Sequence, residues 1–184
     1  MNNENTLQRS YQTLIHPYAR HITHAVTLTL KLRAKVRVKR FENYGNDCYE
    51  YWVALDEEKI GSTLRRFTAR LTALLYGNHA KHKNKQAFAK PLIIAAVEGL
   101  RSQHKRPHLH LALGNIPQAK LARINDWIEQ AWRECDFGYK EIKVKPLHDE
   151  QGWLNYITKE VGYANDDTLD VVASTIPQFI QQSI

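Results

Sequence analysis

Histidines at alternate positions, His108 and His110, indicate a metal site in the segment Pro107–Leu113, which reads PHLHLAL. In a β-strand this spacing puts both imidazoles on one face, about 6–7 Å apart along the strand, so they can converge on one ion. An apolar run, Leu92–Glu98, precedes this segment and ends in a carboxylate. Because the connection between the two segments is short, we expect an antiparallel hairpin that brings Glu98 back to the histidines. The sequence therefore predicts a metal held by Glu98, His108 and His110.

The types of ligand narrow the choice of metal. Imidazole and carboxylate ligands without thiolates suit Mn²⁺ or Mg²⁺ at a site that handles phosphate, although zinc can occupy the same atoms. Cys48 and Cys135 are far apart and form no Cys-x-x-Cys pattern, which argues against a disulfide framework or a thiolate zinc site. His148 is an alternative third ligand in place of Glu98. A purely structural metal is disfavoured, because three ligands leave the coordination sphere open.

A second pair of reactive groups, Tyr156 and Lys159, lies in the expected helix Glu150–Val161. A spacing of three puts the phenol and the ammonium on adjoining surface of a helix. A phenol that titrates near ~10 is a poor nucleophile at neutral pH, so a neighbouring cation would favour phenolate or stabilise a pentavalent phosphate. The plainer interpretation is a packed aromatic ring beside a solvated lysine.

The elements that must position these groups follow from hydrophobic periodicity. Alternating or continuous apolar runs predict strands at His24–Arg33, Tyr49–Leu55, Leu92–Glu98, Pro107–Leu113 and Lys140–Pro146. The run Leu92–Glu98 is suited to a central strand. Helical spacing predicts helices at Glu57–Tyr76, from Pro117 to Trp132, at Glu150–Val161, and in a short tail segment broken at Pro177.

Length and charge restrict the class of protein. With 184 residues and 43% hydrophobic composition, residues 1–184 fit a single compact domain. An excess of 26 Lys and Arg over 19 Asp and Glu gives a formal charge of +7, and basic runs lie between Lys31 and Arg40 and between His79 and Lys85. Such a surface favours a nucleic-acid partner. The sequence contains no ~20-residue apolar run, and Met1–Ser10 lacks an apolar signal region, so we expect a cytoplasmic protein without a membrane partner.

The order of these motifs resembles the HUH endonuclease superfamily. Its components are a Thr-rich first strand (Thr27-Leu28-Thr29), then Glu98, then the His-hydrophobic-His of Arg106–His110, then Tyr156-x-x-Lys159. The resemblance spans most of the chain and is closest to the rolling-circle replication initiator (Rep) proteins of small phages, phage-like elements and plasmids. A His-hydrophobic-His alone is a weak signal, whereas the ordered set is fairly specific.

This resemblance implies a fold and a reaction. The fold would be a ferredoxin-like α+β domain: a central antiparallel sheet with helices against one side and the histidines on its middle strands. His108, His110 and Glu98 would hold the metal, and Tyr156 would attack a single-stranded or hairpin DNA origin to form a 5′-phosphotyrosine, with Lys159 positioning or activating the reaction. The chain lacks a Gly-x-x-x-x-Gly-Lys-Ser/Thr loop, so strand separation would need a separate host or element helicase.

Several points stay open at this stage. Position 160 is Glu and Tyr163 lies seven residues after Tyr156, which favours a single-tyrosine enzyme in which Tyr163 packs. Trp153 and Tyr139 could stack on unpaired bases, although core packing is the stronger interpretation for Trp153. Lys105 and Arg106 are candidates to hold backbone phosphates. The alternatives to a replication nickase are a single-strand transposase or relaxase of the same superfamily, or a non-catalytic nucleic-acid-binding module.

Overall fold

The computed structural model describes residues 3–39, 48–82, 88–100, 102, 104–159, 161 and 174–181. Four strands form the main sheet in the order β4-β5-β1-β6, and all neighbouring strands are antiparallel. Their bounds are β1 (Ile22–Leu30), β4 (Leu92–Glu98), β5 (His108–Gly114) and β6 (Gly138–Pro146). One strand separates β1 from β4 and β5 from β6, and a helical crossover spans each gap, as in a ferredoxin-like fold. The expected antiparallel α+β architecture is confirmed.

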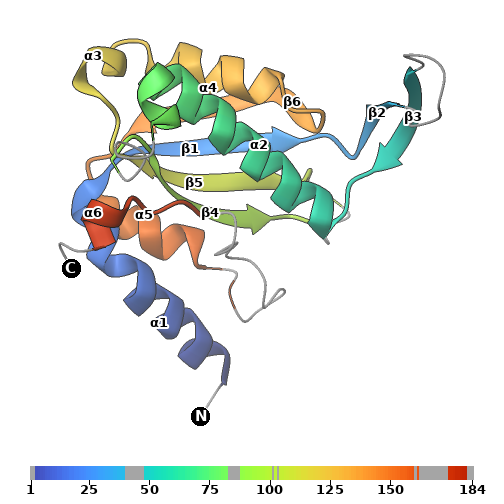
Figure 1. Cartoon of the computed structure of the whole chain (residues 1–184). Coiled ribbons are helices and arrows are strands. Elements are labelled where there is room, and N and C mark those ends of the chain that lie inside the picture. The colour runs from blue at the N-terminus through green and yellow to red at the C-terminus, as the bar shows by residue number, and fades with distance from the viewer. Residues whose placement is uncertain are drawn as a thin grey trace.

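Helices cover both faces of the sheet, as Figure 1 shows. The crossover helices α2 (Glu57–Tyr76) and α4 (Ile124–Arg133) lie above it in that view, and α1 (Asn3–Ile15), α5 (Glu150–Ile157) and α6 (Gln178–Gln181) lie below. The expectation of helices against one side was therefore wrong. It was wrong because the two crossovers share one face, while the terminal segments of the chain return to the other.

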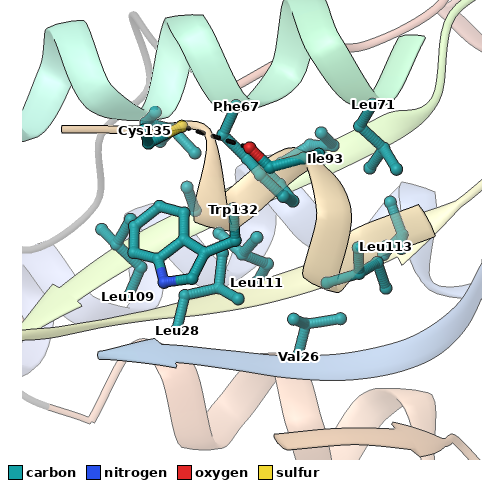
Figure 2. Packing of buried hydrophobic residues seen from close by; sticks show 14 of the residues in the cluster. Val26, Leu28, Phe67, Leu71, Ile93, Leu109, Leu111, Leu113, Trp132 and Cys135 are labelled. Atoms are coloured by element: carbon teal, nitrogen blue, oxygen red, sulfur yellow. Dashed lines mark hydrogen bonds between the residues drawn. The ribbon is translucent and has the colours of Figure 1, made fainter. Parts of the chain in front are cut away.

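The face under α2 and α4 is a continuous apolar core. Figure 2 shows Phe67 of α2 and Trp132 of α4 above the leucines of β1 and β5. Phe67 and Trp132 are fully buried and meet edge to face, with ring centroids 5.7 Å apart. Leu109 and Leu111, which alternate with the two histidines along β5, are also fully buried on this side. Alternation along β5 therefore directs its leucines into this core and its histidines to the opposite face.

Several elements differ from the sequence-based expectation. β4 was expected to be a central strand, but it lies at the edge of the main sheet. It is nevertheless buried along its whole length, because helices cover both its faces and Ile93 pairs with Thr175. The first strand ends at Leu30, and a further strand, β2 (Arg33–Lys39), pairs with β3 (Cys48–Ala54) in a separate sheet. α1 and the 3₁₀ segment η1 (His16–His21) were not predicted.

The remaining helices follow the predictions with altered ends. α2 has the expected bounds. It is capped by Asp56, whose carboxylate accepts from the Lys59 amide at 2.8 Å, and it is followed by its C-cap residue Gly77, which has a φ of 56°. The segment after Pro117 is two helices, α3 (Gln118–Leu121) and α4, and α5 ends at Ile157 rather than Val161. The tail pattern predicted a short helix broken at Pro177, and α6 begins directly after that proline. None of the helices in the described ranges combines the length and apolar character that a membrane crossing needs.

A close backbone approach fixes the end of β5. A Cβ built on Gly114 would lie 1.9 Å from the carbonyl oxygen of His21, the last residue of η1. No side chain fits in that space. Gly114 therefore lets the backbone of η1 pack directly against the last residue of β5, at the other end of the strand from His108.

Candidate functional site

Glu98, His108 and His110 come together at one end of the main sheet. The β4–β5 ladder pairs Glu98 directly with His108, as the predicted hairpin requires. The Nε2 atoms of the two histidines are 3.1 Å apart, and Oε2 of Glu98 lies 3.0 Å from Nε2 of His110 and 3.7 Å from Nε2 of His108. One ligand atom from each residue lies within 4.8 Å of the other two, so the group could hold a metal ion. His148 is exposed and is not part of this group.

Hydrogen bonds to the far side of each ring orient the histidines. Nδ1 of His108 donates to the carbonyl oxygen of Arg106 at 2.9 Å, so the neutral ring keeps an unprotonated Nε2 toward the site. Nδ1 of His110 lies 3.1 Å from the Thr27 hydroxyl on the neighbouring strand. A hydroxyl can donate or accept, so Thr27 can hold His110 in either tautomer. Thr27 belonged to the sequence motif, but its contact with His110 depends on a strand register that the sequence does not give.

Charges around Glu98 keep the site in a form that can bind a cation. Glu98 is 5% exposed and receives two ammonium groups, Lys159 at 2.9 Å on Oε2 and Lys105 at 3.3 Å on Oε1. Burial by itself raises the pKa of Glu98, but the hydrogen bond and charge of Lys159, together with His108 and His110, lower it to about 2. Burial lowers the pKa of His110 to about 4. At neutral pH Glu98 is therefore ionised and His110 is neutral, as metal ligation requires.

The donor set fits a divalent cation with open coordination positions. It offers one carboxylate and two imidazoles, and the described part of the chain brings no thiolate to it. Oε2 of Glu98 faces both His110 and Lys159, so a bound cation would share this oxygen with the ammonium. A site that places a metal position beside a fixed ammonium is suited to an anionic ligand such as a phosphodiester.

Helix α5 carries Tyr156 to the same face of the sheet. The helix is capped by Asp149, whose carboxylate accepts from the Gly152 amide at 2.7 Å, and the Trp153 indole donates to the Leu111 carbonyl of β5 at 3.2 Å. The Trp153 and Tyr156 rings stack at 5.2 Å with 14° between their planes. Trp153 thus packs as the sequence indicated, and it also holds the tyrosine in place.

Tyr156 stands between the histidines and solvent. Its ring centroid is 5.2 Å from that of His110, at 80°, and the residue is 42% exposed. Nζ of Lys159 lies 3.8 Å from the Tyr156 ring centroid and also contacts Glu98. Burial by itself lowers the pKa of Lys159, but its contacts with Tyr156 and Glu98 raise it above the ordinary value. Lys159 follows the end of α5 in a turn, so the turn and not the predicted helix brings it to Tyr156.

The remaining candidates have separate positions. Lys105 contacts Glu98, and the Arg106 guanidinium lies over the Tyr139 ring at 4.5 Å. Tyr163 lies outside the described residues. Sequence reasoning missed the contact between Gln12 of α1 and Thr158, whose side chains are 3.3 Å apart behind the tyrosine helix. No local pattern could have found this contact, because it joins residues 146 positions apart.

Comparison with known proteins does not assign the chain to a family. No family description, curated protein or solved structure matches it. The assignment of function must therefore come from the geometry: a two-histidine, one-carboxylate group, an exposed tyrosine beside it, and a lysine that contacts both the tyrosine and the carboxylate.

Proposed function

We propose that this chain nicks and rejoins single-stranded DNA, with Tyr156 as the nucleophile. The contact of Lys159 with both Tyr156 and Glu98 carries the proposal, because one ammonium then joins the attacking group to the metal ligands. The exposure of Tyr156 leaves room for a strand of DNA. The resemblance to HUH replication initiators supplies the biological role, which is to start rolling-circle replication of a phage, plasmid or phage-like element.

The reaction is a transesterification between the tyrosine and the DNA backbone. The Tyr156 oxygen loses its proton and forms a bond to phosphorus, and the bond from phosphorus to the 3′ oxygen breaks, so that the leaving oxygen takes up a proton. The 5′ phosphate stays on the tyrosine as an ester, and attack by a 3′ hydroxyl reverses the step. Lys159 places its positive charge where the phosphate would carry its negative charge. No nucleotide cofactor is consumed in this exchange.

The metal would support this step by its charge. A divalent cation held by Glu98, His108 and His110, for which we propose Mn²⁺ or Mg²⁺, would polarise the scissile phosphodiester. The same chemistry serves a single-strand transposase or a relaxase, so the replicative role is the more specific part of the proposal. A separate helicase would expose the single-stranded or hairpin origin.

A covalent-adduct assay tests the proposed reaction. Labelled single-stranded oligonucleotides that tile the DNA encoding the chain are incubated with the protein and Mn²⁺, and adducts that resist denaturant are counted. We expect an adduct with the native chain and a loss of at least about 10³-fold in Tyr156→Phe, because the nucleophile is gone. The matched control, Tyr18→Phe, changes a half-buried tyrosine packed against the same cluster as α5 and should keep the adduct.

Two outcomes would contradict the proposal. One is an adduct that persists in Tyr156→Phe. The other is an adduct that forms without added metal in the double variant His108→Ala and His110→Ala, which removes two of the three ligands. Mass spectrometry of a protease digest would locate the modified residue in either case.

A further inference from the structure

The two-stranded sheet of β2 and β3, here called the β2–β3 ribbon, is separate from the main sheet. In Figure 1 it extends beyond the end of β1 and stands apart from the helices. Its attachment is apolar: Ala34 is buried, and Val36 and Val53 pack against the core under α2 and α4. The rest of the described ribbon is open to solvent and carries side chains that the candidate site does not use.

One face of the ribbon is basic and aromatic. Arg33, Lys35 and Arg37 alternate along β2, and residues directly opposite each other in an antiparallel pair share a face, so Trp52 stands beside Lys35. Nζ of Lys35 lies 5.8 Å from the Trp52 ring centroid, and Trp52 is 65% exposed. Glu50 is the only acidic residue in either strand of the ribbon, and it pairs with Lys35 at 3.8 Å. Positive charge therefore surrounds an exposed indole.

The other face, which also carries the attachment residues Ala34, Val36 and Val53, has two further exposed rings. Tyr49 and Tyr51 stack with centroids 5.8 Å apart and 25° between their planes. They are 51% and 46% exposed, although aromatic rings of this size are ordinarily more buried. Of the two faces, the one with Trp52 combines an exposed ring with cations. Single-stranded nucleic acid uses such a surface, since a base stacks on the ring while the phosphates meet the charges.

A hollow at the base of the ribbon adds a concave site. Its volume is about 440 Å³, and its lining includes Arg33, Lys35, Trp52, Arg133 and Asp136. This size lies within the ~300–1,000 Å³ range of pockets that hold small organic groups. A base stacked on Trp52 would enter a space with cations on two sides, one from the ribbon and one from the end of α4.

The ribbon begins at the end of the main sheet that holds the histidines. Thr29 pairs with His108 in the β1–β5 ladder, and the Leu30 amide donates to the Pro107 carbonyl at 2.9 Å. β2 begins at Arg33, three residues further along the chain. The ribbon and the metal group therefore lie at the same end of the sheet, and a strand of DNA that passed around this end would reach both.

We propose that the β2–β3 ribbon is a second binding site for single-stranded DNA, separate from the group that contains Tyr156. An unpaired base stacks on Trp52, and Arg33, Lys35 and Arg37, on the same face of the ribbon, hold the neighbouring phosphates. The choice of DNA as the polymer rests on the proposed function, whereas the stacking surface stands on its own geometry. The ribbon would hold the strand beside the site while the covalent step proceeds.

The test measures binding without cleavage. A fluorescein-labelled 20-nucleotide oligo(dT) is titrated with the full chain in EDTA, and anisotropy gives the dissociation constant. We expect Trp52→Ala to weaken binding by about 5- to 150-fold, the loss of one stacked base. Lys35→Gln should weaken binding and reduce the magnitude of the slope of log K against log salt by about 0.7, one phosphate contact on a single strand. Because Trp52 and Lys35 are exposed, both variants should melt within a few degrees of the native chain.

Matched controls change the same chemistry elsewhere. Phe88→Ala removes an aromatic ring that is 60% exposed, and Lys145→Gln removes an exposed charge on β6, both outside the ribbon and outside the two basic runs. Both controls should bind oligo(dT) like the native chain. Native-like binding by Trp52→Ala and Lys35→Gln would overturn the proposal, as would tighter binding of an RNA oligomer or of a duplex of the same length.

The result separates this proposal from the proposed function. If no oligonucleotide forms an adduct while Trp52→Ala still weakens binding, the nicking proposal is wrong and the proposal that the ribbon binds DNA is supported. If adducts form on Tyr156 while both ribbon variants bind like the native chain, the nicking proposal is supported and the proposal that the ribbon binds DNA is wrong.

Discussion

The two faces of the main sheet differ in character: one is an apolar core and the other carries the candidate metal group. On the face under α2 and α4, every strand contributes apolar side chains to one continuous core. On the face under α5, a smaller apolar cluster adjoins a charged group at one end, where Glu98 and His110 are nearly as buried as the leucines. Strand β5 serves both, since Leu109 and Leu111 face one side and His108 and His110 the other. Stability should therefore depend mainly on the first face and binding on the second.

The largest expected effect tests the apolar face. Leu111 is fully buried in the larger core, so Leu111→Ala should lower the free energy of unfolding by about 2–5 kcal/mol through lost transfer energy and a cavity. Urea denaturation followed by circular dichroism measures the change. The folded fraction should still bind Mn²⁺, because the histidines face the other way. Loss of Mn²⁺ binding by folded Leu111→Ala would contradict the division between the faces.

The next effect concerns acid stability on the polar face. The pKa of His110 is about 4 in the folded chain, against an ordinary value of 6.5. Between these pH values His110 is therefore protonated in the unfolded chain but not in the folded chain. In EDTA the free energy of unfolding should fall as the pH is lowered through this window, by on the order of 1–3 kcal/mol from His110. Glu98, with a folded pKa of about 2 against an ordinary 4.5, should add a further loss between those values.

Urea titrations at fixed pH values measure both windows. In His110→Gln the free energy of unfolding should fall much less than in the native chain between pH 6.5 and 4. In Glu98→Gln it should fall much less below pH 4.5. A His110→Gln profile that follows the native profile across the upper window would show that the buried imidazole is not its source.

The smallest expected effect concerns the orientation of one ligand. Thr27→Val keeps the shape of the side chain but removes the hydroxyl that contacts Nδ1 of His110. Such contacts behind a ligand typically account for about 10–100-fold in metal affinity, and we expect a loss of that size in Mn²⁺ titrations by calorimetry. Thr23→Val, on the same strand but at the far end, is the control. Equal affinities in Thr27→Val and the native chain would reduce Thr27 to a packing role.

Much of the fold could be predicted because its elements have strong local patterns. The bounds of α2 and β4 follow from apolar spacing with clear stops, and the hairpin that pairs Glu98 with His108 follows from a short connection. The burial of β4 misled the prediction about its place in the sheet. A run of apolar residues indicates that both faces of a strand are buried, and helices on the two sides of a sheet bury an edge strand in this way as well as a central one.

The contacts that complete the site are long-range and carry no local signature. Strand register sets Thr27 against His110, and the packing of α5 on β5 sets Trp153 against Leu111. In the ribbon, β3 matches the strand predicted at Tyr49–Leu55, whereas β2 escaped prediction for a different reason. The basic run of β2 resembles a solvated surface, and the alternation of Arg33, Lys35 and Arg37 with Ala34 and Val36 indicates a strand only with β3 beside it.

Gly114 has a consequence for how this sequence can vary among its relatives. A Cβ at that position would meet a backbone oxygen, which cannot rotate away as a side chain could. In any chain that shares this sheet and its histidine pair, the sixth residue after the first histidine should therefore be glycine, even where most other positions have diverged. This spacing, His-x-His-x-x-x-Gly, gives a compact signature for recognising distant relatives whose overall similarity has faded.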